Sequence, residues 1–242
     1  MIGCLCIHGY TGGPYEVEPV AEHLKKSTDW QVEVPCLPGH GEHLDLKGVT
    51  YEQWVTAAEQ ELEKLTRICD EIYLIGFSMG GMIASYLAAK YDVSKLALLS
   101  PAGKYLSFKQ MGVELAGFAV KGIKGKLKDD PLYSNYRWKL GSVPLTSMLE
   151  FQKCVRFARP YLGKINCPVM IAQGRQDSMV PYKTLHYLDK EISSETQLIL
   201  YDNSKHHICL GEEKEELAQA VYSFLTSDRG DLDKVEVEAT IQ

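Results

Sequence analysis

Short apolar runs alternate along the chain with longer segments in which apolar residues recur every three or four positions. The first pattern is typical of strands that are buried on both faces, and the second is typical of amphipathic helices. Their alternation predicts an α/β fold with a mostly parallel sheet of about six or seven strands flanked by helices. The strand candidates are residues 2–7, 31–35, 71–76, 95–100, 169–173 and 196–201.

Local signals mark the starts of several helices. Pro14 suits the first turn of a helix that continues through residues 15–26. Thr50 and Gln53 form a capping-box pattern ahead of a helix with a regular apolar face. Acidic residues at 212–216 favour the start of a last helix, because the helix dipole attracts negative charge there.

The alternation stops after Ser100 and resumes near Cys167. We therefore predict a single domain over residues 1–242, with a small helical cap inserted at about 101–165. Such insertions between sheet strands often cover active sites. The polar end of the chain, at about 227–242, is expected to be a tail or a short edge element.

Composition narrows the possible partners and the compartment. A formal net charge of −6 and the lack of any nucleic-acid-binding signature argue against nucleic acid. No apolar run approaches the roughly 20 residues that cross a bilayer, and the N-terminus does not resemble a secretory signal. Seven cysteines without a CxxC pair indicate reduced thiols in a cytoplasmic protein, with no disulfide framework and no metal site.

The predicted cap is basic although the whole chain is acidic. Residues 101–165 contain 12 Lys and Arg against 4 Asp and Glu, a local balance of +8 (12 − 4). Peripheral contact of this cap with anionic lipid surfaces or acidic substrates is one hypothesis, without stable membrane insertion. A solvated lysine-rich face is the alternative.

Candidate chemistry centres on Gly76-Phe77-Ser78-Met79-Gly80, a G-x-S-x-G motif. The motif follows the apolar run 72–75 and precedes the helix-like segment 81–87, as a nucleophile elbow requires. Glycines are needed there because the turn brings strand and helix so close that a Cβ would clash. We predict Ser78 as a nucleophile; a glycine-rich turn that packs a small serine is the alternative.

A serine nucleophile needs a base and an orienting acid, which follow it in the chain after later strands. Asp177 stands after the strand candidate 169–173, although it could merely cap the next helix. His206 and His207 both follow the strand candidate 196–201, and only one of them can face the serine. We favour His206, and we rank Asp202 second to Asp177 as the acid.

Donors for a developing oxyanion are the backbone N–H after the nucleophile and one from an early loop. These positions correspond to Met79 and to Tyr10, which lies in the glycine-rich loop 7–13. The same loop could instead bind phosphate, but it carries no G-x-G-x-x-G pattern and no Walker-type lysine.

Five motifs in this order resemble bacterial carboxylesterases and monoacylglycerol lipases of the α/β-hydrolase superfamily. They are His8-Gly-Tyr-Thr-Gly-Gly13, Pro38-Gly-His-Gly41, Gly76-Phe-Ser-Met-Gly-Gly81, Gly174-Arg-Gln-Asp177 and Ser204-Lys-His206. The resemblance runs from Leu5 to Leu225 and is weakest in the predicted cap. Lys205, where the family usually has glycine, and Gly211, where it often has an acid, depart from the pattern.

The resemblance implies an α/β-hydrolase fold and site roles for specific residues. Ser78 would be the nucleophile, Asp177 the acid and His206 the base, since the family's histidine motif reads Ser-x-His. The backbone donors would be Tyr10 and Met79. The cap would shape an acyl pocket, which apolar cap residues could line, although such residues are often ordinary core. These residues are Phe108, Met111, Leu115, Phe118, Trp138, Met148 and Phe151.

The function expected from the sequence is hydrolysis of a small-molecule carboxylic ester through an acyl-enzyme, without cofactor or metal, by a monomer or homodimer. Thioester hydrolysis, perhydrolysis and carbon–carbon bond hydrolysis are alternatives, because the same fold and residues serve many reactions. A ligand-binding relative without activity is a further alternative.

Overall fold

The strands form one parallel sheet. The computed structural model describes residues 1–104, 143–227 and 236–239. Within these ranges seven strands lie in the order β2-β1-β3-β4-β5-β6-β7, and every neighbouring pair is parallel. The strands are β1 (Ile2–Ile7), β2 (Gln31–Glu33), β3 (Glu71–Phe77), β4 (Lys95–Leu99), β5 (Val169–Gly174), β6 (Thr196–Tyr201) and β7 (Glu236–Ala239).

All six strands predicted from the apolar runs are present, with ends that differ by no more than two residues. The largest difference is in β2, which ends at Glu33, two residues before Pro35. Proline has no N–H to donate to a neighbouring strand, so it does not extend an edge strand such as β2. At the opposite edge, β7 pairs with β6, so the C-terminal region contributes a short edge element.

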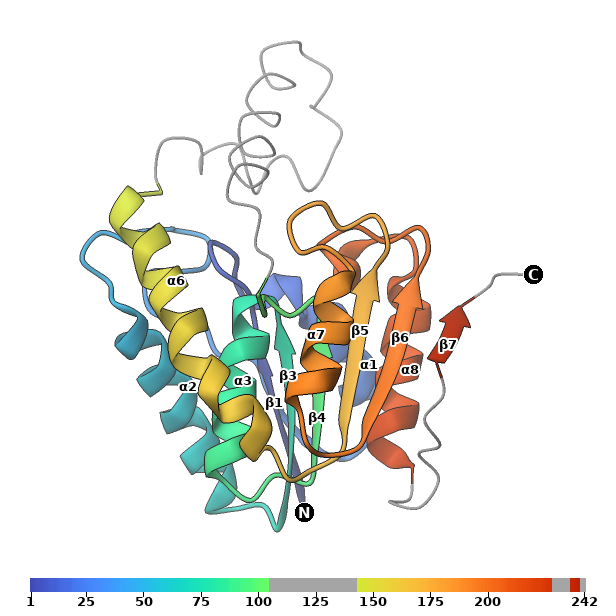
Figure 1. Cartoon of the computed structure of the whole chain (residues 1–242). Helices are drawn as coiled ribbons and strands as arrows, with labels where there is room; N and C mark the ends of the chain where they lie inside the picture. Colours follow the sequence, from blue (N-terminus) through green and yellow to red (C-terminus); the bar gives the residue numbers. More distant parts are fainter. Residues whose placement is uncertain (105–142, 228–235, 240–242) are drawn as a thin grey trace.

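Helices cover both faces of the sheet (Figure 1). One face is covered by α1 (Glu18–Ser27) and α8 (Lys214–Thr226). The other face is covered by α2 (Tyr51–Thr66), α3 (Met79–Lys90), α6 (Leu145–Ala158) and α7 (Lys183–Glu191). The sheet is thus the middle of three layers.

Side chains of each central strand alternate between the two cores. In β1, Leu5 and Ile7 join the core beneath α2, α3 and α6, whereas Cys4 and Cys6 join the core beneath α1 and α8. Since successive residues of a strand point to opposite faces, a strand between two helical layers is apolar at most positions. This explains the continuous apolar runs in the sequence.

The first helix is shorter than the pattern predicted. A 3-10 turn, η1 (Pro14–Glu16), precedes α1, and the two are separated at Val17, which has φ −112° and ψ −4°. Pro19 in the first turn of α1 has no N–H, so it cannot donate to the carbonyl of Tyr15. An α-helix therefore cannot run unbroken from residue 15, and α1 starts at Glu18.

Helix α6 falls within the segment 101–165 that we expected to form a cap. Its buried residues Phe151, Cys154 and Val155 pack into the core of the sheet, and the helix lies beside α3 and α2 (Figure 1). The part of the predicted cap from residue 145 onward is therefore layered against the main body. Residues 105–142 of the predicted cap lie outside the described residues.

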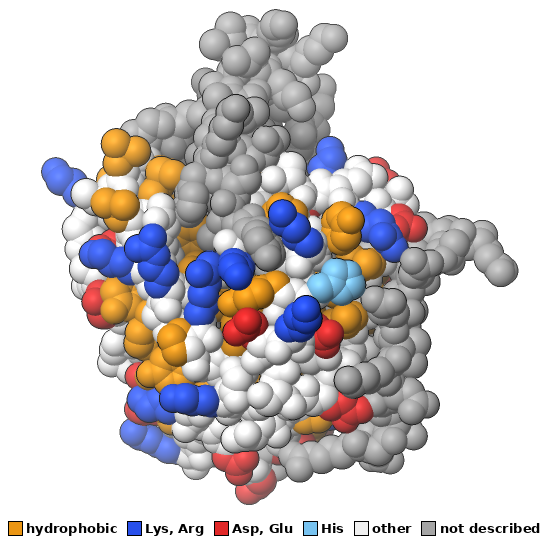
Figure 2. Space-filling model, viewed as in Figure 1, with side chains coloured by type: hydrophobic (Ala, Val, Ile, Leu, Met, Phe, Trp, Pro, Cys, Tyr) orange, Lys and Arg blue, Asp and Glu red, His pale blue; other side chains and the backbone are white. Residues whose placement is uncertain are grey.

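The start of α6 also carries exposed apolar side chains. Leu145 and Leu149 are 80% and 56% exposed. Hydrophobic side chains gather at this end of the helix, with Lys and Arg side chains nearby on the same face (Figure 2). α6 therefore presents apolar groups on both its buried and its solvent side near its N-terminus.

A buried lysine connects the sheet to the last helix. Lys95, the first residue of β4, is 3% exposed, and its Nζ donates to the carbonyl oxygens of Phe224 (2.8 Å) and Leu225 (3.1 Å). The last carbonyls of a helix have no partner within the helix, and a cation is favoured at that end. Lys95 therefore caps the C-terminus of α8.

Among the helices within the described ranges, none combines the length and the apolar character needed to cross a membrane.

Candidate active site

Ser78 lies in the tight turn between β3 and α3. Its backbone has φ 53° and ψ −113°, a region that costs a non-glycine residue about 1–3 kcal/mol. The turn is held by the N–H of Ser78, which donates to the carbonyl of Leu99 at the end of β4 (2.9 Å). A Cβ at Gly80 would overlap with the carbonyl oxygen of Ile7, so the glycine is required by the close approach of α3 to β1. This geometry is that of the predicted nucleophile elbow.

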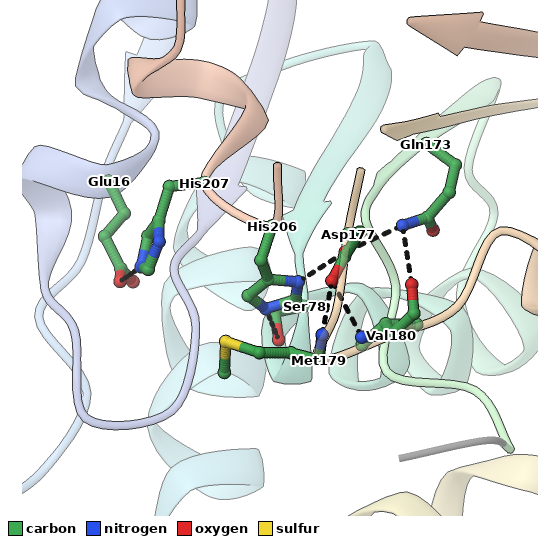
Figure 3. A network of polar contacts seen from close by, with 8 residues as sticks. All are labelled: Glu16, Ser78, Gln173, Asp177, Met179, Val180, His206 and His207. Carbon is green, nitrogen blue, oxygen red and sulfur yellow. Dashed lines mark hydrogen bonds and ion pairs between the residues drawn. The ribbon is translucent and has the colours of Figure 1, made fainter. Parts of the chain in front are cut away.

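His206 lies in the loop after β6, and its ring reaches Ser78 in the turn after β3. Its Nε2 is 3.0 Å from Ser78 Oγ, and its Nδ1 is 2.7 Å from Asp177 Oδ2 (Figure 3). All three residues are no more than 6% exposed. The structure thus brings together the three side chains that the sequence analysis selected, from loops after β3, β5 and β6.

The carboxylate of Asp177 is held by four hydrogen bonds. Oδ1 accepts the backbone N–H groups of Met179 (2.9 Å) and Val180 (2.8 Å). Oδ2 accepts the amide of Gln173 (2.8 Å) and faces His206. One oxygen therefore caps the following turn while the other orients the histidine, so the two alternative roles of Asp177 fall on different oxygens.

These contacts determine which ring nitrogen of His206 carries the hydrogen. An ionised carboxylate can only accept, so Nδ1 donates to Asp177. In the neutral ring Nε2 is then the acceptor, and it faces the hydroxyl of Ser78. The arrangement can therefore take a proton from the serine oxygen.

The other two candidates in this region lie elsewhere. The carboxylate of Asp202 is 2.5 Å from Nε of Arg175, and both side chains are at least a third exposed. His207 Nε2 is 3.5 Å from the buried Glu16 and not beside the serine (Figure 3).

Tyr10 follows β1, and its backbone N–H has a fixed direction. The preceding carbonyl, that of Gly9, lies 2.9 Å from Nδ1 of His8 and 3.4 Å from the N–H of Gly12. Since the N–H of Leu37 donates to Nε2 of His8 (3.0 Å), the ring hydrogen is on Nδ1, which donates to Gly9. In a trans peptide the N–H points opposite to the carbonyl, so the two bonds to Gly9 fix the N–H of Tyr10.

Met79 is the first residue of α3. The N–H groups of a first helical turn have no partner within the helix, and the helix dipole adds partial positive charge there. The backbone N–H that follows the serine is therefore suited to an anionic oxygen.

The side chain of Tyr10 joins the early loop to α6. Its ring stacks on Phe151 with centroids 4.8 Å apart and an interplanar angle of 3°, and its hydroxyl is 2.6 Å from Ser147 Oγ. Burial raises the pKa of Tyr10 to about 12, although the hydrogen bond with Ser147 opposes the shift. The ring stack and the hydroxyl contact therefore join the early loop to the first half of α6.

Of the residues proposed to line an acyl pocket, two lie in α6. Phe151 is buried against Tyr10, and Met148 is half-buried. The remaining five lie outside the described residues: Phe108, Met111, Leu115, Phe118 and Trp138.

Sequence reasoning missed several polar residues that support the site. Gln173 is a fully buried amide at the end of β5, and a polar residue within an apolar run four positions before Asp177 could have signalled it. His8 was quoted only as part of a motif. Glu16 was not considered, because an acid near a helix start ordinarily favours the helix dipole.

In the part of the chain that the structure describes, no cluster of three or more His, Cys, Asp or Glu side chains could hold a metal ion.

Comparison with known proteins identifies the architecture. The sequence model of a family described as the alpha/beta hydrolase fold matches residues 5–123, which include the turn at Ser78. A solved structure, from work on the metagenome-derived lipolytic enzymes LipS and LipT, superposes with a TM-score of 0.71. It covers 93% of both chains at 20% identity. The chain has the α/β-hydrolase fold. The parallel sheet and the strand–turn–helix at Ser78 are consistent with it.

Two curated relatives extend the similarity over nearly the whole α/β-hydrolase chain. The thermostable monoacylglycerol lipase of Bacillus sp. (strain H-257) is 27% identical over 235 residues, which cover 95% of this chain and 92% of the lipase. The carboxylesterase of Bacillus subtilis (strain 168) is 23% identical over 226 residues, which cover 91% of each protein. The resemblance to bacterial carboxylesterases and monoacylglycerol lipases is thereby confirmed.

Proposed function

We propose that this α/β-hydrolase cleaves carboxylic esters through an acyl-enzyme on Ser78, in the manner of a carboxylesterase or monoacylglycerol lipase. One observation carries the proposal. A continuous line of contacts runs from Ser78 Oγ to His206 Nε2 (3.0 Å) and from His206 Nδ1 to Asp177 Oδ2 (2.7 Å). A serine hydroxyl with a base and an orienting acid in this geometry is an activated nucleophile.

In the first step, Oγ of Ser78 attacks the ester carbonyl carbon while Nε2 of His206 takes the hydroxyl proton. The carbonyl oxygen becomes an oxyanion, which accepts hydrogen bonds from the N–H groups of Met79 and Tyr10. The protonated ring of His206 then gives its proton to the alcohol oxygen as the carbon–oxygen bond breaks. The acyl group remains on Ser78, and the alcohol leaves.

In the second step, water repeats the attack on the acyl-enzyme. His206 takes a proton from the water as its oxygen adds to the carbonyl carbon, and it returns that proton to Oγ of Ser78 when the acid leaves. Asp177 holds the ring orientation throughout and stabilises the charge of the protonated ring. The protein, the ester and one water molecule account for every bond made and broken in the two steps.

The proposed substrate class rests on the acyl-transfer chemistry of Ser78 and on the names of the two relatives. The relatives named as a monoacylglycerol lipase and a carboxylesterase support an ester of one acyl chain as the substrate of this chain. We also propose that the insertion at about 101–165 determines which acyl chains are accepted; its residues 105–142 lie outside the described residues. Contact of this basic segment with anionic lipid stays a prediction, as do the cytoplasmic location and the monomeric or dimeric state.

The first test is labelling of the wild-type protein and of Ser78→Ala with a fluorophosphonate. We expect the wild type to be labelled at Ser78 and to hydrolyse p-nitrophenyl butyrate. The Ser78→Ala variant should lose label and about 10⁶-fold in kcat, the loss typical when a serine nucleophile is removed. A Ser78→Ala protein that keeps the wild-type rate would overturn the assignment.

The second test separates the ester reaction from other reactions of the same residues. A panel of p-nitrophenyl esters and monoacylglycerols of increasing chain length, with a thioester and a vinylogous 1,5-diketone, is compared by kcat/KM. Esters should be preferred. A thioester or diketone hydrolysed faster than every ester would replace the proposed reaction with thioester or carbon–carbon bond hydrolysis.

A further inference from the structure

We propose that Glu16 and His207 form a positioning pair that holds the loop carrying Tyr10 against the loop carrying His206. The inference rests on the proposed ester hydrolysis, because it concerns the alignment of the oxyanion donor with the base. It gives a role to His207, the chain neighbour of His206 that does not reach Ser78.

Glu16 is a buried carboxylate directly beneath the early loop. It ends the turn η1, it is 2% exposed, and its Oε2 accepts the backbone N–H of Gly9 at 3.0 Å. A buried carboxylate without such partners would cost several kcal/mol, so its position implies that these contacts are kept.

The early loop is wrapped tightly around this carboxyl group. A Cβ at Gly12 would overlap with the carboxyl atoms of Glu16, and a Cβ at Gly9 would lie 3.2 Å from Oε2. Gly12 therefore leaves the space that the carboxyl group fills, whereas at Gly9 the ring of Phe77 is slightly nearer, at 3.0 Å. The loop conformation and the place of Glu16 depend on each other.

The second contact of Glu16 crosses to the histidine loop. Its Oε1 lies 3.5 Å from Nε2 of His207, and Figure 3 shows the two side chains together, apart from the Asp177 side of the site. His207 is the chain neighbour of His206. The ring of Phe77 packs against both, with centroids 5.2 Å from His206 and 5.7 Å from His207.

The pair thus acts at two positions that are each one residue, along the chain, from a group that the proposed reaction uses. Gly9, held by Glu16, precedes Tyr10, and His207 follows His206. An oxyanion donor contributes chiefly when the transition state forms, and a misplacement of about 1 Å can cost roughly 10²-fold in rate. Weakening the contact between Glu16 and His207 should therefore lower kcat and leave KM nearly unchanged.

The decisive variants change His207, whose side chain is 30% exposed and can be replaced without opening the core. His207→Phe keeps a ring but removes the polar contact with Glu16. His207→Gln offers an amide N–H at a similar distance along the side chain. We expect His207→Phe to lower kcat about 10-fold with KM within about 2-fold, and His207→Gln to restore most of the loss.

Glu16→Gln and the double variant Glu16→Gln/His207→Phe complete a double-mutant cycle. If the two residues act as one unit, the double variant is no slower than the slower single variant. Glu22→Gln, which alters the exposed pair of Glu22 with Lys25 on α1, is the matched control and should keep the wild-type kcat. Rates are divided by the active-site concentration, measured by fluorophosphonate titration, so that loss of folded protein does not count as loss of kcat.

The outcomes separate this proposal from the function on which it rests. A wild-type protein that neither binds fluorophosphonate nor hydrolyses esters would overturn both. An active wild type with His207→Phe at unchanged kcat, or with effects of the two substitutions that simply multiply, would overturn the positioning pair alone. A rise in KM at constant kcat would do the same, since it would place the pair in substrate binding.

Discussion

Replacing Asp177 by asparagine tests the direction of every hydrogen bond in the proposed site. Oδ1 accepts the N–H groups of Met179 and Val180, so the amide oxygen of asparagine takes its place. The new NH2 group then faces Nδ1 of His206, which has to become an acceptor. The ring hydrogen moves to Nε2, 3.0 Å from Ser78 Oγ, where the ring can no longer take the serine proton.

The expected loss follows from this change of tautomer. An asparagine in place of the orienting acid lowers kcat about 10⁴-fold in serine hydrolases of this kind, or about 5 kcal/mol of transition-state stabilisation. The free energy of unfolding of Asp177→Asn should change less than its transition-state stabilisation. Within the described residues, Oε1 of Gln173 is buried without a hydrogen-bond partner, so its amide can flip to accept from the new NH2 group. The flip sacrifices the bond from Gln173 to the carbonyl of Val180 (3.1 Å), at about 1–3 kcal/mol.

The assay compares Asp177→Asn with Asp202→Asn. Asp202 is the other acid near the histidine loop, and it contacts Arg175 at the surface, so its variant should keep kcat within about 2-fold, as surface pairs contribute little. Hydrolysis of p-nitrophenyl butyrate gives kcat and KM, and urea unfolding gives the free energy of unfolding for both variants.

Two results would refute the reasoning. Asp177→Asn with more than a tenth of the wild-type kcat would mean that the ring tautomer does not depend on this carboxylate. A large loss in Asp202→Asn at unchanged stability would mean that Asp202 orients the histidine during the reaction.

Two further predictions concern stability. Lys95→Met should lower the free energy of unfolding by about 1–3 kcal/mol in urea, because the carbonyls of Phe224 and Leu225 lose a buried donor. Tyr10→Phe should cost about 1 kcal/mol at pH 7 through loss of the bond to Ser147, with kcat nearly unchanged because the oxyanion donor proposed at this position is the backbone N–H. Burial raises the pKa of Tyr10 from 10.0 to about 12, so between these values only the unfolded wild-type chain ionises this hydroxyl. Wild-type stability therefore falls over that pH range, and its advantage over Tyr10→Phe narrows.

Each of these stability predictions has a clear contrary result. An unchanged urea midpoint in Lys95→Met would show that water or another group caps α8 equally well. A gap between wild type and Tyr10→Phe that stays constant from pH 7 to pH 12 would show that the Tyr10 hydroxyl ionises as readily in the folded chain as in the unfolded one.

The sheet was predictable because its strands lie between two helical layers. The run at residues 72–75 is apolar at every position, which is the usual pattern of a strand that contributes to two cores. Helix starts were less predictable. The separation of η1 from α1 depends on the missing N–H of Pro19, whereas the pattern drew attention to Pro14. The place of α6 could not be read from the sequence, since an amphipathic helix looks the same in a cap and beside a sheet.

The site was predictable where the chemistry needs a particular residue after a particular strand. Ser78, Asp177 and His206 each follow a strand end, and the structure brings them together. The residues that support them were not predictable, because their roles depend on contacts between distant segments. Glu16 has an ordinary position in the sequence, and its contact with Gly9 follows only from the folded loop. Gln173 stands out as a polar residue at the end of an apolar run, but its bond to Asp177 does not.

The close approach of α3 to β1 has a consequence for how this protein can diverge. Gly80 packs against the carbonyl groups of Ile7 and His8, so main-chain atoms alone place the start of the helix beside the start of the early loop. The two proposed donors are likewise main-chain groups, at positions 10 and 79. A side-chain change at either position that keeps the fold, such as Tyr10→Phe, should therefore leave both N–H groups where they are.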